Sequence, residues 1–428
     1  MEWLYGPNSP NSSKSQRPLM IQTGKESEDS LQSIGIFNQD IKRLEEDGCV
    51  VLSGPDSSLA YNIKAKITAY SLDRKASNIL LGLGGAYCDL CNRSKEECLD
   101  ISIVNQGIDI SRDINEIYRI FEEHQQEDGT IKKNPNDYKT RTGVTSRPIT
   151  TNQVISVQVL HALMRVCDFY MKLSVHLSAA VFVWTESKTS RQYKFIENAK
   201  ANLQKKIQAN TGIRWDYVDS SGNSGTSTTG NTCRRILHDP NVRRLVTEEI
   251  PVSHRETMEE LGMRLSVILR VMSSSEEIDT ERFKQFCTET NIILIEKFPR
   301  VYDKKKPGPW ISVTPTVHKI LAHSWELIQN NDSRGLSNLD ESGMEGCNKI
   351  VRSIRKAHSR KISQDANLID TFRRLWVGSD PKINQIRLMS RPACTSCHQI
   401  GHSTRSCPTV AVHTVDKQED ALFKSFCI

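Results

Sequence analysis

The spacing of apolar residues along the 428-residue chain predicts a mainly helical protein with a few strands near its start. In several long stretches apolar side chains recur every three or four residues, which is the period of a helix buried on one side. Residues 62–73 alternate with the period of a half-buried strand, and the apolar run 49–52 is typical of a buried strand. The segments that we expect to be helical are 31–46, 112–123, 154–180, 194–206, 258–272 and 281–298.

Residues 310–361 hold the densest group of candidate functional residues. A helix is expected to begin near Pro315, and it carries His318 and His323. Two histidines five residues apart are separated by about 140° around an ideal helix. This spacing argues mildly against a shared metal ion, although an irregular first turn after Pro315 would weaken the objection. On the pattern alone, core or surface histidines explain the pair better than metal ligands do.

A second helix in this stretch is expected to bury one face and to expose a basic one. Its apolar stripe consists of Ile350, Val351, Ile354 and Ala357. Its basic residues are Lys349, Arg352 and Lys356, with Arg355, Arg360 and Lys361 nearby. One acid, Glu345, stands at the head of this helix.

Two interpretations of Glu345 are open at this point. Ser342 and Glu345 fit a capping box, in which the glutamate accepts a hydrogen bond from a free amide at the helix start. Alternatively, a carboxylate at the N-terminal end of a cationic helix can hold a metal ion beside a phosphate backbone. The local pattern by itself favours the capping interpretation.

Two features of the first hundred residues suggest chemistry. Asp73 ends the predicted strand 62–73, which is a common catalytic position, although a strand-end aspartate is more often simply solvated. Cys88 and Cys91 form a C-x2-C pair after a glycine-rich turn. A tetrahedral site needs two more ligands; Cys98 is close, but no second C-x2-C follows. The pair therefore leaves metal binding and buried thiols about equally open.

A flexible segment rich in glycine, serine and threonine, residues 219–230, leads directly into Arg234 and Arg235. A glycine-rich backbone followed by paired arginines can clamp a phosphodiester. The same pattern also fits a mobile surface loop, and neither hypothesis is favoured.

Composition sets the class of protein. The chain is long enough to bury a sizeable core in two or three domains. Its net charge of +6 and isoelectric point of about 8.6 permit nucleic-acid binding without requiring it. No apolar run approaches the roughly 20 residues of a membrane span, and residues 1–18 lack the apolar region of a secretory signal. Twelve cysteines without an export signal suggest thiols and metal sites in a reducing compartment.

The strongest local motif lies near the C-terminus. It has the spacing C-x2-C-x4-H-x4-C, with Gly401 providing the tight turn before its histidine. Three thiolates and one imidazole complete a tetrahedral zinc site, so we expect a zinc knuckle. Such knuckles usually bind single-stranded or distorted nucleic acid, although this one lacks aromatic residues between its ligands. The four ligands are Cys394, Cys397, His402 and Cys407.

Taken together, these segments resemble the catalytic core of the V(D)J recombination-activating protein 1 family and its Transib-type transposase relatives. The matching motifs, in chain order, are R-P-L-M-I-Q-T-G-K-E-S-E-D-S-L from Arg17, L-D-R-K at Asp73, Y-C-D-L-C-N-R, G-N-T-C-R-R, H-K-I-L-A-H, and E-G-C-N-K-I-V-R-S-I-R-K. The joint spacing is far more specific than any single motif.

The resemblance assigns roles to these residues. It places Asp73 and Glu345 on the second and third acids of a DDE triad that holds Mg²⁺ or Mn²⁺ for DNA nicking and strand transfer. It places Cys88 and Cys91 in one zinc site with His318 and His323, although the two pairs stand far apart in the sequence. The residues expected to contact DNA are Arg234, Arg235, Lys349, Arg352 and Lys356.

The resemblance also implies a fold and a division of the chain. We expect an α+β, mostly helical protein: an incomplete RNase H-like DDE core with a large helical insertion and a zinc site, plus a small C-terminal zinc knuckle. Residues 1–16 are expected to be disordered and residues 17–385 to form the core. Residues 386–410 would form the knuckle, and residues 411–428 a loose tail.

One departure from the family separates two hypotheses. The family's first catalytic aspartate lies upstream of the segment matched at Arg17, and the sixteen residues before Arg17 contain no aspartate. We therefore expect a truncated copy of a DNA-recombining enzyme. The alternative is a non-catalytic, zinc-dependent DNA-binding protein derived from a transposase. Either hypothesis implies DNA as the partner and a nuclear, non-membrane protein; the family also suggests a homodimer and a subunit similar to recombination-activating protein 2.

Overall fold

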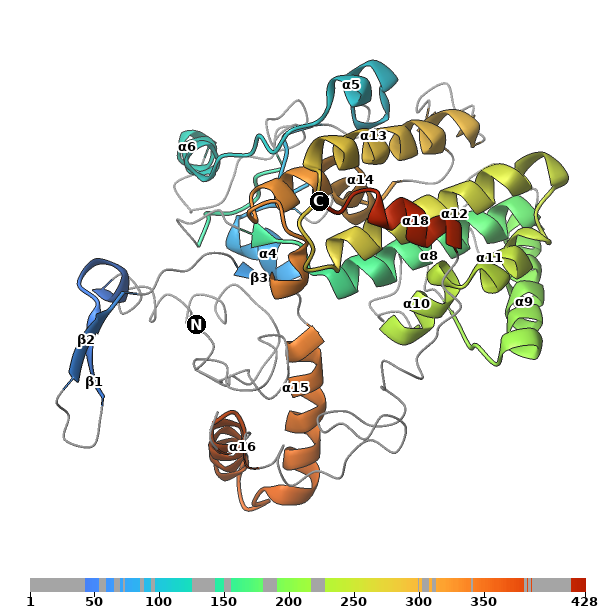
Figure 1. The fold of residues 1–428 in the computed structure, drawn as a ribbon. Helices are drawn as coiled ribbons and strands as arrows, with labels where there is room; N and C mark the ends of the chain where they lie inside the picture. The colour runs from blue at the N-terminus through green and yellow to red at the C-terminus, as the bar shows by residue number, and fades with distance from the viewer. Residues whose placement is uncertain are drawn as a thin grey trace. The chain divides into compact units, whose positions relative to one another are not determined.

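The computed structural model is mostly helical and divides into two compact units (Figure 1). Among the described residues, one unit contains 43–93 and 109–158, and the other contains 97–108 and everything from 159 onward. The structure describes residues 43–53, 59–64, 70–71, 74–84, 88–93, 97–124, 143–149, 155–179, 191–216, 228–298, 300–301, 308–309, 313–339, 342–380, 383, 386 and 417–428.

The first unit contains two small sheets. β1 (Cys49–Ser53) pairs antiparallel with β2 (Leu59–Ile63), with Cys49 opposite Ile63. β3 (Tyr70–Ser71) pairs in parallel with β4 (Ile155–Ser156). In the second unit β5 (Arg300–Val301) pairs antiparallel with β6 (Gly308–Pro309). All described strands thus belong to two-stranded sheets, and the RNase H-like core expected from the resemblance is not confirmed.

These strands correct two expectations. The strand predicted over 62–73 is wrong in extent, because β2 ends at Ile63 and β3 has a different partner. The helix predicted from residue 154 begins only at Val159, since Ile155 and Ser156 pair with β3. Sequence alternation shows which residues suit a strand, but it does not show which segment supplies the hydrogen bonds.

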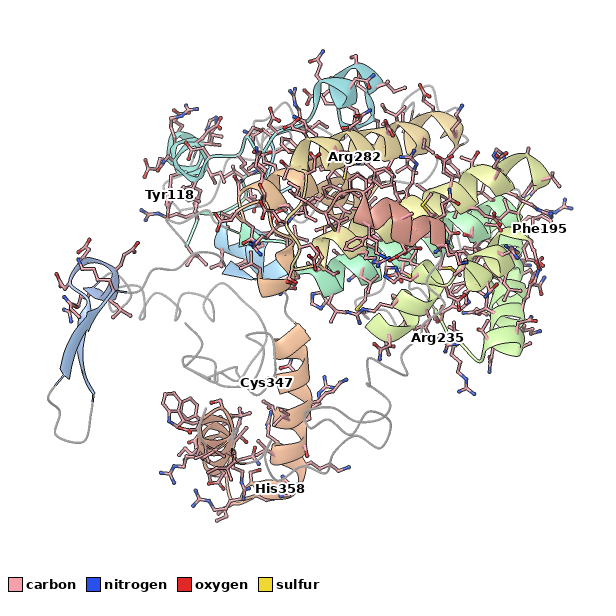
Figure 2. The ribbon with its side chains drawn as sticks, viewed as in Figure 1. Tyr118, Phe195, Arg235, Arg282, Cys347 and His358 are labelled. Carbon is pink, nitrogen blue, oxygen red and sulfur yellow. The ribbon has the colours of Figure 1, made fainter. Side chains whose placement is uncertain are left out.

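Helices α4 (Arg74–Leu80) and α6 (Ile114–His124) complete the first unit. Its apolar core consists of Leu81, Leu83, Ile114, Ile117, Ile120, Phe121 and Val144, with Tyr118 of α6 packed against it (Figure 2). Gly82 has a φ of +67°, and a Cβ at this position would collide with the carbonyl group of Ser146. Only glycine can make this turn and allow the close approach of the two chain segments.

The second unit is built around α8 (Val159–Ser178), which is buried along most of its length. It contacts α9 (Arg191–Thr211), α10 (Gly230–His238), α11 (Pro240–Thr247), α12 (Val252–Met272) and α14 (Pro315–Gln329). Gly262 lets α12 lie close to α8, since a Cβ there would be 2.8 Å from the hydroxyl of the fully buried Tyr170. The helices expected over 194–206, 258–272 and 281–298 are confirmed with small changes of boundary, the last as α13 (Thr280–Lys297).

A further pair of helices has its own small core. α15 (Ser342–Ser353) continues into a π-helical turn, Ile354–His358, and α16 (Gln364–Gly378) follows. The core of this pair is made by Cys347, Ile354 and Leu375, with Ile350 and Val351 packed against them (Figure 2). The predicted stripe at 350, 351 and 354 therefore lies in or beside this core, whereas Ala357 is exposed. The π turn adds a residue to the helical repeat, which moves Ala357 out of register.

The described C-terminal residues, 417–428, contradict the prediction of a loose tail over 411–428. Helix α18 (Lys417–Lys424) packs on α12 (Figure 1). Phe426 is 1% exposed, and its ring lies 5.7 Å from that of Phe283 and 5.2 Å from that of Phe286, centroid to centroid. Two backbone hydrogen bonds, from Asp279 N to Phe426 O at 2.8 Å and from Ile428 N to Glu277 O at 3.0 Å, fix the last residues.

A buried polar cluster holds α18 in place. The Glu419 carboxylate is 1% exposed; it lies 3.0 Å from Nη1 of Arg243, and it accepts a hydrogen bond from Ser266 Oγ at 2.7 Å. His238 Nδ1 lies 3.2 Å from the same carboxylate. Burial by itself raises the pKa of Glu419, but its contacts with His238, Ser266 and Arg243 outweigh burial and leave that pKa below its usual value.

Replacing Glu419 with glutamine should lower the free energy of unfolding by about 3–5 kcal/mol at neutral pH, because the buried ion pair with Arg243 loses its negative partner. A depressed pKa in the folded state stabilises above the unfolded value and loses that effect as pH falls. The difference in the free energy of unfolding between wild type and variant should therefore shrink below about pH 4.3, the ordinary pKa of glutamate. Urea unfolding at several pH values measures this.

The control is Asp420→Asn on the same helix, which removes ion pairs with Arg270 and Lys424 that are partly exposed. It should cost about 1 kcal/mol or less, as exposed pairs do. If both variants lose the same free energy of unfolding, the burial of Glu419 does not strengthen its ion pair.

Several expectations fall outside the described residues. These are the disordered start at 1–16, most of the helix predicted at 31–46, Asp73, and the knuckle at 386–410. Residues 43–46 are helical, in agreement with the end of the first predicted helix. Within the described part of the chain, no helix has the length and apolar character needed to cross a membrane.

Candidate metal centre

The two histidines of α14 lie near each other in spite of their spacing. The helix begins at Pro315, and the side chain of Thr314 caps it by accepting a hydrogen bond from Val317 N at 3.3 Å. The rings of His318 and His323 are perpendicular, with centroids 5.1 Å apart. Imidazoles that start from different sides of a helix can still converge, because each ring reaches well beyond its Cα. The five-residue spacing, which argued mildly against a shared metal ion, does not keep the two rings apart.

The C-x2-C pair sits in a tight, buried turn that its own unit shapes. Leu90 N donates to Cys88 Sγ at 3.4 Å, and the amides of Ser111 and Arg112 both donate to Leu90 O. Inside the turn, the buried carboxylate of Asp89 accepts a hydrogen bond from Ser77 Oγ at 2.8 Å. The turn that carries both cysteines is therefore held by hydrogen bonds to the amide and the carbonyl group of Leu90.

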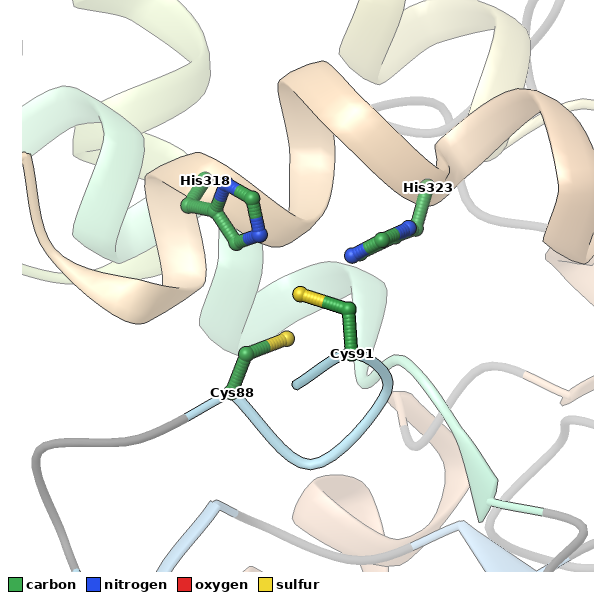
Figure 3. Close-up of side chains that lie close together, drawn as sticks. All are labelled: Cys88, Cys91, His318 and His323. Atoms are coloured by element: carbon green, nitrogen blue, oxygen red, sulfur yellow. The ribbon is translucent and has the colours of Figure 1, made fainter. Parts of the chain in front are cut away.

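Four side chains come together at this point. One ligand atom from each of Cys88, Cys91, His318 and His323 lies within 4.8 Å of the other three, and all four residues are buried. Figure 3 shows the two thiols and the two imidazoles pointing toward one another. The cluster could hold a metal ion.

The burial of His323 supports a ligand at this position. The side chain is 0% exposed, and neither of its ring nitrogens has a hydrogen-bond partner in the described structure. A buried polar atom without a partner costs about 1–3 kcal/mol. A bound metal ion would satisfy one of these nitrogens, so the donor set and its burial both fit metal binding.

A buried guanidinium adds positive charge near the thiols. Arg112 is 4% exposed and its Nη2 donates to the carbonyl oxygen of Cys91 at 2.9 Å. Burial lowers the pKa of Arg112, and the charges of Cys88 and Cys91 oppose that shift. A guanidinium here would offset the negative charge that two metal-bound thiolates carry. Sequence reasoning missed Arg112, which lies 21 residues after Cys91 and belongs to no recognisable motif.

A third thiol lies at the edge of the cluster. Cys98 Sγ is 3.8 Å from His318 Nε2. Cys98 was noted in the sequence for its closeness to the C-x2-C pair, but nothing in the spacing indicated that it would lie beside a histidine 220 residues away.

The other predicted site residues are placed separately from this cluster or lie outside the description. Glu345 belongs to α15, and its side chain is not described. Lys349, Arg352 and Lys356 are exposed on the same helix and its π-helical extension. Asp73 and the knuckle residues Cys394, Cys397, His402 and Cys407 are outside the described residues.

Arg234 and Arg235 lie on a helix, not in the flexible segment that precedes them. Thr229 caps α10 by accepting a hydrogen bond from Thr232 N at 3.3 Å, and both arginines are exposed (Figure 2). Arg235 Nη2 donates to the carbonyl oxygen of Thr211 at 3.0 Å. A phosphate group would therefore meet the arginines on a rigid element.

Comparison with known proteins gives no further assignment: no protein-family model matches this chain, and a search of curated proteins finds no match. The observations above therefore rest on the residues and their geometry.

Proposed function

We propose that this chain is a zinc-dependent DNA-binding protein of the recombination and transposition type, resembling the V(D)J recombination-activating protein 1 family. The observation that carries the proposal is the convergence of Cys88, Cys91, His318 and His323. The resemblance requires these four residues to meet, although the cysteine pair and the histidine pair stand far apart in the sequence. Few unrelated reasons would bring two distant pairs of metal-ligating residues into one buried cluster.

Zinc is the ion that best suits the donors. Two thiolates and two imidazoles in a closed arrangement form the tetrahedral set found in structural zinc sites. Carboxylate-rich sites would suit magnesium or calcium instead, and this cluster contains no carboxylate. Four protein ligands leave no open coordination position, which favours a structural ion over a catalytic one.

DNA binding is supported by the charge on the helix pair formed by α15 and α16. Residues 342–380 contain eight lysines and arginines and four acids. Of these, Arg360 is engaged with Asp370 at 2.9 Å, whereas Lys349, Arg352 and Lys356 are exposed on one helix and its extension. A row of exposed cations on a helix is suited to phosphate contacts, which dominate the affinity of proteins for DNA.

The chemistry that the resemblance implies would use carboxylates. In the proposed enzyme Asp73 and Glu345 hold divalent ions that activate water, and then a DNA 3′-hydroxyl, for nicking and strand transfer. An RNase H-like arrangement would bring the two acids together. Two acids can bind one ion well, whereas a pair of ions about 4 Å apart needs a bridging carboxylate.

A plasmid assay tests this proposal. The purified chain should bind duplex DNA with an affinity that falls steeply with salt, because phosphate contacts release counterions. With only Asp73 and Glu345 as matched acids, it should show little or no nicking in Mg²⁺ or Mn²⁺.

Glu345→Gln serves as the matched variant in the same assay. Strong nicking that disappears in Glu345→Gln would show that a further acid completes the site and that the chain is an active nuclease. DNA binding with no nicking in either protein would favour the non-catalytic alternative. Absence of DNA binding at low salt would contradict the proposal in both forms.

A further inference from the structure

Cys98 lies beside one ligand of the metal centre, His318, without belonging to the four-residue cluster. Its Sγ atom is 3.8 Å from Nε2 of His318. A sulfur and a nitrogen bound to one tetrahedral zinc ion are about 3.5 Å apart, as follows from zinc bond lengths of about 2.3 and 2.0 Å. The Cys98 thiol is therefore a close neighbour of the His318 nitrogen, next to the position that this imidazole occupies in the cluster.

Local structure holds this thiol in place. Cys98 lies in the short 3-10 helix Glu97–Leu99, directly before α5 (Ile101–Gln106). Asp100 caps α5, accepting hydrogen bonds from the amide and the hydroxyl of Ser102 at 2.8 and 2.5 Å, and α5 packs against α13. The backbone next to Cys98 is thus held by the cap of α5 and by the packing of α5 on α13.

We propose that Cys98 is a reserve ligand of the metal centre. When the imidazole of His318 is withdrawn, the Cys98 thiolate takes its coordination position, so that three thiolates and His323 hold the same ion. The bond from the metal to the His318 imidazole breaks, a bond to Cys98 Sγ forms, and the thiol proton passes to solvent, which reaches the half-buried Cys98.

His323 is fully buried, with no polar neighbour within hydrogen-bonding distance. The Cys98 thiol contacts His318, and this contact places the exchange at the position of His318.

This inference rests on the metal centre of the proposed function and is independent of DNA binding. The test uses the full chain carrying Cys397→Ser and Cys407→Ser, so that the predicted knuckle contributes no zinc. The zinc content is measured after gel filtration for three variants in this background: His318→Ala, His323→Ala, and His318→Ala combined with Cys98→Ser.

His318→Ala should keep about one zinc ion per chain, as expected for a four-ligand site, whereas the other two variants should lose it. Loss of zinc from His318→Ala alone would overturn the inference, as would retention in the combined variant, since water would then fill the position. Absence of zinc from the knuckle-free parent would instead contradict the metal centre itself.

Thiol labelling provides a second measurement that does not depend on stoichiometry. In the parent protein Cys98 should react with iodoacetamide, because it is not bound to the ion. In zinc-loaded His318→Ala it should be protected, and a chelator should restore the reaction. Equal reactivity of Cys98 in both proteins would exclude its coordination. Cobalt substitution adds a spectroscopic check, since the thiolate-to-cobalt absorption should increase from two thiolates to three.

Discussion

Replacing Cys91 with serine should release the ion from the centre and destabilise the fold by several kcal/mol. Structural zinc sites bind with apparent free energies of about 10 kcal/mol or more, and much of this energy supports folding. A loss of about 4 kcal/mol corresponds to a fall of roughly 10 °C in the melting temperature of a unit of this size. Thermal unfolding followed by circular dichroism, with zinc content measured on the same sample, tests this expectation.

The matched control is Cys347→Ser, which changes another buried cysteine that lies outside the cluster. It should retain the ion and lose only the smaller packing contribution of a thiol. In the background of Cys397→Ser and Cys407→Ser, a chelator should reproduce the Cys91→Ser effect but add nothing to the Cys91→Ser variant. If Cys91→Ser and Cys347→Ser unfold at the same temperature, the cluster is not held by a metal ion.

Reversing the charge of both Lys349 and Lys356 should weaken binding to duplex DNA by about 10- to 100-fold at 0.1 M salt. Each lysine that neutralises a phosphate contributes roughly 0.9 to the slope of log affinity against log salt. Loss of two contacts should therefore reduce that slope by about 2. Fluorescence anisotropy over a range of salt concentrations measures both quantities.

The control reverses Lys194 and Lys205, two exposed lysines of α9. It makes the same change in net charge on a helix to which no DNA contact is assigned. If long-range attraction alone governs binding, the two double variants will weaken DNA binding equally. That result would remove the basis for assigning DNA contacts to the helix of residues 342–358.

Much of the metal centre could be predicted from the sequence, but only through the combination of motifs. The spacing of His318 and His323 favoured separate roles, and the C-x2-C pair was ambiguous. The helix holding the histidines was predictable, since Pro315 marks its start and apolar residues recur along it. What periodicity cannot show is that a turn in the first hundred residues faces that helix, because contacts distant in sequence leave no local pattern.

The C-terminal helix shows a second structural feature that could not be predicted from the sequence. Half of residues 417–428 are apolar, but they stand in two runs of three, which is too short a pattern to predict a packed helix. Their packing depends on Glu419, whose partners Arg243 and Ser266 lie far earlier in the chain. A buried ion pair between distant segments has no signature in either segment. The predicted strand boundaries were wrong for a related reason: Tyr70 pairs with Ile155, which lies far away in the sequence.

The most direct test of the central claim is zinc-edge X-ray absorption on the chain carrying Cys397→Ser and Cys407→Ser. The account predicts bound zinc with two sulfur ligands at about 2.3 Å and two nitrogen ligands at about 2.0 Å. Absence of zinc, or a shell made only of nitrogen and oxygen, would contradict the assignment of Cys88, Cys91, His318 and His323 to one metal centre.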